Sequence, residues 1–243
     1  MSHIEHHVEQ GSEAWHHARA GVITASKVSM VRDKYKTGPN KGEWKSAALD
    51  YAFKLAIERE SGVPLEDDEF APWQAERGIR LEPEARRAHE VETGLIVRPV
   101  GFVTTEDGKF GVSADGLVGT TPEDPGCEYK CFLAPKKLRA ILLDHDVSEV
   151  SDQCQFGMAI TGRRVWHLGL YCPALECVGR AFTLEVIQRD DAYIDAMWVD
   201  LLAFDRVVDG YRAQLRSTDV PPWCEPMHTA LKASIAAGNL RQA

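Results

Sequence analysis

The stretch GVSADGLVGTTPEDPGCEYKC, residues 111–131, contains two acids and a lysine whose spacing points to both a fold and a chemistry. In a β-strand, residues i and i+2 point to the same face of the sheet. Glu128 and Lys130 therefore share one face of the strand formed by CEYKC, and Tyr129 lies on the other. Asp115 stands on a turn that ends an earlier strand and can present its carboxylate beside a neighbouring strand. The stretch thus predicts an acidic cluster on a sheet.

This cluster has the chemistry of a metal-dependent nuclease. Two carboxylates from adjacent strands are hard oxygen ligands that suit Mg²⁺. A protonated lysine cannot ligate the metal, but it can hold a water molecule and stabilise charge on a phosphate. The arrangement Asp, Glu-x-Lys is that of the PD-(D/E)xK nucleases. An exposed salt bridge between Glu128 and Lys130 explains the same two residues equally simply.

Two residues outside the stretch extend the candidate site. Glu82 lies on a predicted helix, from which an acid can supply a further metal ligand, and a solvated glutamate is the alternative. Gln153 lies on the helix predicted after the strand with Glu128. An amide there can bind the DNA backbone or orient a catalytic group, or it can simply face solvent. Trp15, by contrast, is predicted to belong to the core.

Composition restricts the class of protein. The 243 residues are 44% hydrophobic and 27% charged, which is typical of a soluble globular protein. No apolar run approaches the roughly 20 residues of a membrane span, and no secretory signal is recognised, so we expect a cytoplasmic protein. A net charge of −9 argues against non-specific coating of nucleic acid, but not against a nuclease with one basic channel. The six cysteines form no CxxC pair and are predicted to be free thiols.

The order of the predicted elements indicates an α/β fold. Helices come first, then a strand meander, a helix, further strands and a long helix, which is typical of a mixed central sheet flanked by helices. We predict one domain over residues 1–220 and a tail of uncertain packing over 221–243. The predicted helices are 13–20, 25–31, 45–60, 72–93, 148–161 and 190–215. The predicted strands are 95–104, 110–114, 117–119, 127–131, 164–171 and 179–187.

Several motifs together resemble one known family. VEQGSEAWHHARAGVITASKV, GIRLE, SADGL, CEYKC and DQCQFGM occur in the order seen in the lambda-exonuclease family, the YqaJ-type viral recombinase nucleases. The resemblance spans about residues 8–215, and its N-terminal block is the most specific part. It implies a restriction-endonuclease-like fold and a 5′→3′ exonuclease that digests one strand of duplex DNA from its end. A related endonuclease of restriction or repair and an inactive DNA-end-binding protein are the alternatives.

The resemblance also assigns roles at the acidic cluster. Asp115 and Glu128 would be the metal-binding carboxylates, Glu82 would complete the metal site, and Tyr129 would give its backbone carbonyl to a metal. Lys130 would act as the catalytic base or water activator. Two Mg²⁺ ions are implied, for which Mn²⁺ can substitute.

A phosphate pocket and partners follow from the same resemblance. Arg19 would hold the 5′-terminal phosphate, Ser26 and Ser113 match hydroxyls of that pocket, and Gln153 matches a glutamine that follows the catalytic strand. The sequence departs from the family pattern at Ala114, where a proline is expected. The implied partners are double-stranded DNA ends, a single-strand annealing protein and two further subunits in a homotrimeric ring. The implied setting is the cytoplasm of a bacterial host, with a phage or prophage gene.

Overall fold

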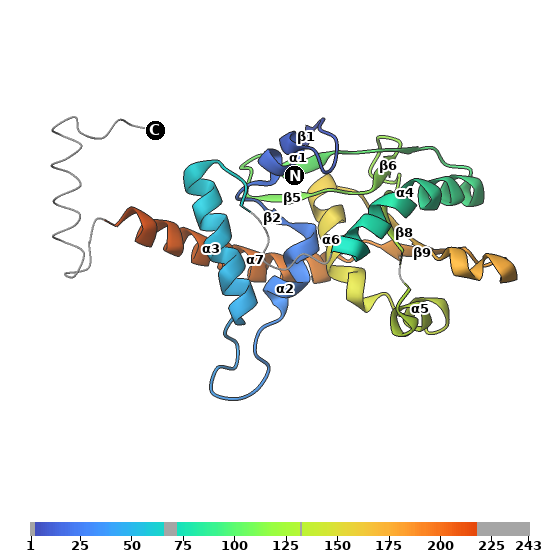
Figure 1. Ribbon diagram of the computed structural model, residues 1–243. Coiled ribbons are helices and arrows are strands. Elements are labelled where there is room, and N and C mark those ends of the chain that lie inside the picture. Colours follow the sequence, from blue (N-terminus) through green and yellow to red (C-terminus); the bar gives the residue numbers. More distant parts are fainter. Residues whose placement is uncertain (1–2, 66–71, 132, 218–243) are drawn as a thin grey trace.

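The computed structural model describes residues 3–65, 72–131 and 133–217 (Figure 1). The predicted α/β class is confirmed, with mixed sheets flanked by helices. The helices are α1 (Glu13–Arg19), α2 (Val28–Arg32), α3 (Ser46–Ser61), α4 (Pro72–Thr93), α5 (Pro135–Leu142), α6 (Ser148–Thr161) and α7 (Asp191–Arg216), with 3₁₀ turns η1 (Ala25–Lys27) and η2 (Pro173–Val178). The strands are β1 (His3–His6), β2 (Ile23–Thr24), β3 (Val97–Arg98), β4 (Phe102–Thr105), β5 (Phe110–Val112), β6 (Gly116–Val118), β7 (Gly126–Lys130), β8 (Val165–Tyr171) and β9 (Phe182–Gln188).

The strands form two sheets where the sequence suggested one central sheet. The four-stranded sheet has the order β1-β4-β5-β2, and the five-stranded sheet has the order β3-β6-β7-β8-β9. Parallel pairing occurs between β2 and β5 and between β7 and β8, and the other pairs are antiparallel. Both sheets are therefore mixed, and β7, which carries the predicted acid and lysine, is the central strand of the larger one.

The single strand predicted for residues 95–104 is divided between the two sheets. β3 pairs with β6, whereas β4 pairs with β5, and the break falls at residues 99–101. Pro99 has no N–H to donate to a ladder. At Gly101 a Cβ would come within 2.2 Å of the carbonyl oxygen of Val8, so the backbones approach closely there. These two residues let a long hairpin bend from one sheet into the other.

A glutamine side chain holds this bend. Gln10 Nε2 donates to the carbonyl oxygens of Val100 and Ala114, each at 2.8 Å, one on each arm of the hairpin. Those carbonyls stand where the strand ladder is interrupted, so the amide replaces the missing partners. Asp115 directly follows Ala114 and precedes β6. The bend thus carries the carboxylate to the junction of the sheets.

Local signals in the sequence set several element ends as predicted. Ser12 caps α1 by accepting from the backbone N–H of Trp15. Gly94 and Gly162 have φ angles of 71° and 72°, a left-handed conformation that favours glycine at the end of a helix. Strand β1 was not predicted, because a four-residue edge strand depends on its partner β4 rather than on its own pattern.

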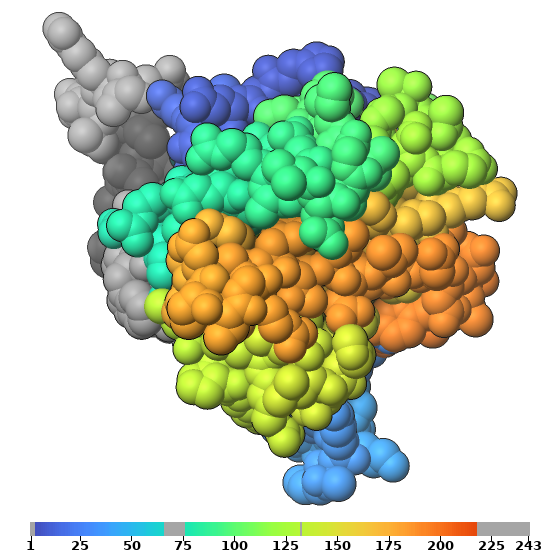
Figure 2. Space-filling view, turned by 90° about the vertical axis from the view of Figure 1, so that its right-hand side faces the viewer, coloured from blue at the N-terminus to red at the C-terminus, as the bar shows by residue number. Residues whose placement is uncertain are grey.

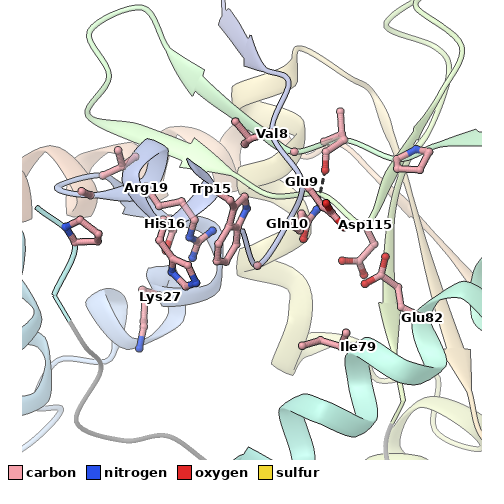
Figure 3. Close-up of a pocket in the computed structure, with 18 of the residues that line it drawn as sticks. Val8, Glu9, Gln10, Trp15, His16, Arg19, Lys27, Ile79, Glu82 and Asp115 are labelled. Atoms are coloured by element: carbon pink, nitrogen blue, oxygen red, sulfur yellow. Dashed lines mark hydrogen bonds between the residues drawn. The ribbon is translucent and has the colours of Figure 1, made fainter. Parts of the chain in front are cut away.

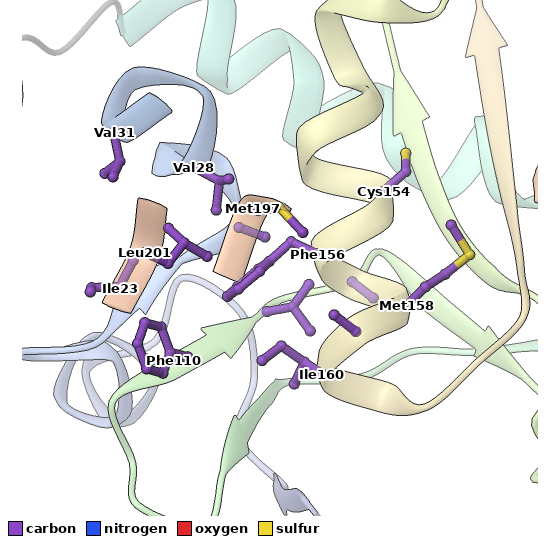
Figure 4. Packing of buried hydrophobic residues seen from close by; sticks show 14 of the residues in the cluster. Ile23, Val28, Val31, Phe110, Cys154, Phe156, Met158, Ile160, Met197 and Leu201 are labelled. Atoms are coloured by element: carbon purple, nitrogen blue, oxygen red, sulfur yellow. The ribbon is translucent and has the colours of Figure 1, made fainter. Parts of the chain in front are cut away.

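Most buried apolar residues form one large cluster, the main core. It lies between helices α2, α3, α6 and α7 and the strands, and Figure 4 shows α6 and α7 side chains meeting those of α2 and β5. The cluster includes Ile23, Val28, Phe110, Phe156, Met158, Ile160, Met197, Leu201, Phe204 and Val208. Five of the cysteines, Cys127, Cys131, Cys154, Cys172 and Cys177, are free.

A second, much smaller cluster lies between α4 and the five-stranded sheet. It consists of Ala85, Val97, Val118, Cys127 and Tyr129. Helix α4 contacts β7, β8 and β9 there, and Figure 2 shows it lying across the molecule beside the segment that contains η2 and β9. None of the described helices is both long and apolar enough to cross a membrane. The tail predicted at 221–243 lies outside the described residues.

Candidate active site

The acid and the lysine of β7 form a closed triangle with an amide from α6. Lys130 Nζ donates to Glu128 Oε1 at 2.7 Å and to Gln153 Oε1 at 3.0 Å. Gln153 Nε2 donates to the same Glu128 oxygen at 2.7 Å. The salt bridge considered from the sequence therefore exists, but it is not exposed, because Glu128 is buried. The other oxygen, Glu128 Oε2, is buried without a hydrogen-bond partner.

Asp115 stands beside this triangle, as the sequence predicted. Its Oδ2 accepts from the backbone N–H of Tyr129 at 2.5 Å, which ties the bend to β7. Burial raises the pKa of Asp115 well above its usual value, and the charges of Glu128 and Glu82 raise it further. At Lys130, burial by itself would lower the pKa, but the carboxylates of Glu128 and Asp115 outweigh it and raise the pKa. Lys130 therefore keeps its proton.

Glu82 completes the group of acids from α4. Figure 3 shows the carboxylates of Glu82 and Asp115 facing each other. Burial raises the pKa of Glu82, and the charge of Glu128 adds to the effect, while Arg86 opposes it. Arg86 Nη2 donates to Glu82 Oε1 at 2.6 Å and to the carbonyl oxygen of Asp115 at 3.1 Å. One guanidinium thus links the helix to the bend.

These residues fit a divalent cation by their chemistry. Among the described residues, no three His, Cys, Asp or Glu side chains are arranged to hold a metal ion as they stand. However, Asp115 and Glu82 each have a raised pKa that is caused in part by Glu128, so negative charge is concentrated there without full compensation. Glu128 Oε2 is an unpaired oxygen at the same place. Hard oxygens with excess negative charge are what Mg²⁺ and Mn²⁺ bind.

A cavity of about 1140 Å³ connects the acids to the predicted phosphate pocket. Glu82 and Asp115 line it at one side and Arg19 at the other (Figure 3). Arg19 Nη1 donates to Ser113 Oγ at 3.1 Å, so the structure brings these two predicted residues together. Trp15 was predicted to belong to the core, but it is only half-buried and lines this cavity instead.

Trp15 holds the arginine in place. The Arg19 guanidinium lies 4.1 Å from the centre of the Trp15 ring, a cation–π contact. Trp15 Nε1 donates to Ser113 Oγ at 2.9 Å, so the indole and the guanidinium share one hydroxyl. The two residues are four apart on α1, a spacing that places them on one helix face and that could have revealed the pair.

Ser26, which the resemblance assigns to the phosphate pocket, lies between two cavities. Its side chain is exposed and lines a separate cavity of about 190 Å³ together with Lys130, Gln153 and Lys137. The Ser26 hydroxyl is 3.4 Å from Thr24 Oγ1, and Thr24 lines the larger cavity. Ser26 therefore lines the cavity beside Lys130 and neighbours, through Thr24, the cavity that Arg19 lines.

Sequence reasoning missed three residues that shape the site. Arg86 was overlooked although its spacing of four from Glu82 on a helix favours an ion pair. Gln10 gave no local signal, because its partners are 90 and 104 residues away in the chain. His89, which contacts the phenol of Tyr129, likewise has no sequence signature.

Comparison with family models shows to which family the chain belongs. The family described as the YqaJ-like viral recombinase domain matches residues 14–164. The chain belongs to this family. The resemblance stated from the motifs is thereby confirmed, and membership supports a role as a DNA exonuclease.

Solved structures of exonucleases are similar to this chain as well. The alkaline exonuclease LHK-Exo from Laribacter hongkongensis is 29% identical over 84% of this chain and 96% of that chain, with a TM-score of 0.69. Its complex with dAMP gives 30% identity, the same coverage and a TM-score of 0.70. A phage-related exonuclease from Haemophilus somnus is 16% identical over 80% of this chain and 96% of that chain, and its TM-score of 0.58 shows the shared fold. No curated protein matches the sequence.

Proposed function

We propose that this protein is a Mg²⁺-dependent 5′→3′ exonuclease that degrades one strand of duplex DNA from its end and leaves a 3′ single strand for recombination. One observation carries the proposal. Asp115 and Glu82, beside the buried Glu128 and its partner Lys130, line the same cavity as Arg19, which donates to Ser113. One cavity thus offers a cleavage centre and a cation for a terminal phosphate.

The acids would hold the metal ions. Asp115, Glu128 and Glu82 would be the ligands, with the backbone carbonyl of Tyr129 as a further one, for two Mg²⁺ or Mn²⁺ ions. Bound there, the ions would supply charge stabilisation for the attacking and leaving oxygens of the phosphodiester. Gln153 would keep Glu128 oriented through the hydrogen bond that it donates to Oε1.

Lys130 would act as a proton-bearing group rather than as a free base. Its raised pKa keeps the ammonium charged, and its hydrogen bonds to Glu128 and Gln153 fix the position of Nζ. From there the ammonium can donate to the attacking water or to a phosphate oxygen, where charge develops during cleavage. The second possibility, an inactive end-binding protein, has no need of such a lysine.

Arg19 would bind the 5′-terminal phosphate. A guanidinium presents two parallel N–H groups that match a phosphate, and the Trp15 ring and Ser113 hydroxyl hold it in one orientation. Gln153 and Ser26, which line the cavity beside Lys130, would contact the backbone of the cleaved strand. A related endonuclease needs no pocket for a chain end, so Arg19 favours the exonuclease.

The experiment is digestion of matched linear and circular duplexes with and without Mg²⁺. The exonuclease is expected to degrade only the linear duplex, only with the metal, and from 5′ ends. Cleavage of the circle would favour the endonuclease. Binding to linear ends without any cleavage in Mg²⁺ or Mn²⁺ would favour the inactive end-binding protein.

The assembly and setting belong to the same proposal. A chain with a net charge of −9 is repelled by DNA over most of its surface, so a closed ring around the duplex would prevent dissociation between cleavage cycles. We expect a homotrimer near three times the 27.0 kDa chain mass in light scattering, and a monomeric or dimeric mass would contradict it. The partners would be DNA ends and a single-strand annealing protein, in the cytoplasm of a bacterial host.

A further inference from the structure

Behind the acidic cluster lies a chain of three hydrogen-bonded side chains from three different elements. Tyr129 of β7 points away from the acids, and its hydroxyl lies 3.2 Å from Nδ1 of His89 on α4. His89 Nε2 lies 2.8 Å from Nδ1 of His167 on β8. We call these residues the Tyr–His–His chain. Each neutral histidine can donate from one nitrogen and accept at the other, so both contacts can be satisfied at once.

The three side chains of the Tyr–His–His chain are buried, and their burial fixes their geometry. His89 is fully buried, and Tyr129 and His167 are 6% and 9% exposed. A buried polar group that loses its partner costs about 1–3 kcal/mol, so each member resists displacement of the others. Gly169 leaves the room that the phenol ring occupies, because a Cβ there would come within 2.7 Å of Tyr129 Cδ1.

Helix α4 connects this chain to the metal-binding acids. Glu82 precedes His89 by seven residues, about two helical turns, so the two side chains lie on the same face of α4. Between them, Arg86 donates to the carbonyl oxygen of Asp115. A displacement of His89 along or around the sheet would therefore move Glu82 relative to Asp115.

Tyr129 is linked to both sides of the site. Its backbone N–H donates to Asp115 Oδ2, while its hydroxyl contacts His89. Besides Arg86, two more residues of α4 make hydrogen bonds across to the sheet side: Arg77 donates to the carbonyl oxygen of Cys131, and Glu84 accepts from the Tyr171 hydroxyl. The second cluster adds only small apolar side chains besides Tyr129. Apolar contacts have no preferred direction, whereas hydrogen bonds do, and those of the Tyr–His–His chain are buried while the bonds of Arg77 and Glu84 are partly or fully exposed, so the chain sets the register of α4 on the sheet.

We propose that His89, His167 and Tyr129 are positioning residues that fix Glu82 at the distance from Asp115 and Glu128 at which the three acids bind a divalent cation together. This inference rests on the proposed function, because it takes the acids to be the metal ligands. The side chains of these three residues touch neither metal nor DNA. They act through Glu82.

A double-mutant cycle on the full chain tests the inference. Calorimetric titration with Mn²⁺ would be done on the wild type, His89→Phe, Glu82→Ala and the double variant. We expect His89→Phe to weaken Mn²⁺ binding by about tenfold, as loss of groups that orient metal ligands does. In the Glu82→Ala background the same change should weaken binding less than twofold, because the residue through which it acts is gone.

Two further variants separate positioning from stability. Tyr129→Phe keeps the ring and removes only the hydroxyl, so it should weaken Mn²⁺ binding in the same direction as His89→Phe and serves if that variant does not fold. Val208→Ala opens the main core, where Val208 is fully buried, and should lower stability without changing Mn²⁺ affinity.

The outcomes are distinct. Equal weakening by His89→Phe with and without Glu82, or no weakening by either His89→Phe or Tyr129→Phe, would overturn the inference while leaving the metal site intact. A wild type that binds no Mn²⁺, or a Glu82→Ala variant with unchanged affinity, would overturn the proposed metal site and this inference with it.

Discussion

The main core and the second cluster hold the molecule together in different ways. The main core is broad and apolar, and it joins helices α2, α3, α5, α6 and α7 to strands of both sheets. The second cluster is small, and beside it three side chains of α4 and the sheet are joined by hydrogen bonds. The first therefore provides most of the free energy of folding, in proportion to buried apolar area. The second buries little apolar area, but with its neighbouring hydrogen bonds it fixes how α4 is aligned on the sheet.

This difference separates stability from the geometry of the site. Of the three acids, Asp115 and Glu128 lie on the sheet and its bend, which the main core supports from α6. Glu82 alone comes from α4, which rests on the second cluster. Damage to the main core should therefore lower stability and leave metal affinity unchanged, whereas damage beneath α4 should weaken metal affinity at a smaller cost in stability.

The largest effect is expected from the reacting groups themselves. Lys130→Ala, Asp115→Asn and Glu128→Gln should each slow digestion of a linear duplex by about 1000-fold or more, because each removes charge that is needed where the phosphodiester is cleaved. Circular dichroism should show an intact fold, since the main core is untouched. If a variant keeps a tenth of the wild-type rate, the substituted residue is not part of the catalytic site.

The next prediction contrasts the two clusters directly. Leu201→Ala removes a fully buried side chain from the main core and should lower the free energy of unfolding by about 3 kcal/mol. Tyr129→Phe removes one hydrogen bond and should lower it by about 1 kcal/mol. Urea denaturation measures both. Mn²⁺ affinity should change only for Tyr129→Phe. A change in affinity for Leu201→Ala but not for Tyr129→Phe would contradict the division between the two clusters.

How far the sequence predicted this arrangement depends on the range of the interactions. Alternation along CEYKC placed Glu128 and Lys130 on one face correctly, because a strand fixes its own side-chain directions. The glycines that end α4 and α6 were equally predictable, because a glycine ends a helix through its own backbone conformation. The hydrogen bonds of Tyr129, by contrast, join residues 40 positions apart, and those of His89 reach 78 positions. A pattern read over a short stretch of sequence cannot predict contacts between residues so far apart in the chain.

The division into two sheets shows the same limit. The apolar run 95–104 predicted one strand, and its proline and glycine were visible, but their meaning depends on Gln10 closing the bend from far away. Ser26 is assigned to the phosphate pocket only by its place in a motif, and that assignment stays a prediction. A motif preserves order in sequence, whereas the cavity that a side chain lines depends on packing, and Ser26 lines the cavity beside Lys130.

Acidity tests the Tyr–His–His chain beside the second cluster. Burial, with a smaller effect of the neighbouring His89, lowers the pKa of His167 to about 4. An unfolded histidine has a pKa near 6.5, so the unfolded state binds a proton first as the pH falls. Stability from this group is present above pH 6.5 and is lost as the pH falls toward 4. The loss is about 2 kcal/mol at pH 5.

The matched variant for this prediction is His167→Phe. It should be less stable than the wild type at pH 7.5, because His89 loses a hydrogen bond, but the difference should shrink as the pH falls to 5. Urea denaturation at both pH values measures the change. A difference that stays constant with pH would mean that His167 does not titrate between the folded and unfolded states as described.

The smallest effect is expected at Arg19, which belongs to neither cluster and is held by Trp15 and Ser113. Arg19→Lys keeps the charge but loses the two-pronged contact with a phosphate. We expect digestion of 5′-phosphorylated ends to slow by about tenfold and of 5′-hydroxyl ends by less than twofold, a difference of about 1 kcal/mol or more. Arg206→Lys, on the exposed surface of α7, is the matched control and should affect neither substrate. Unlike loss of a metal ligand, this change should leave Mn²⁺ affinity and stability unchanged. Equal slowing of both ends would mean that Arg19 supports the packing of α1 and does not recognise the chain end.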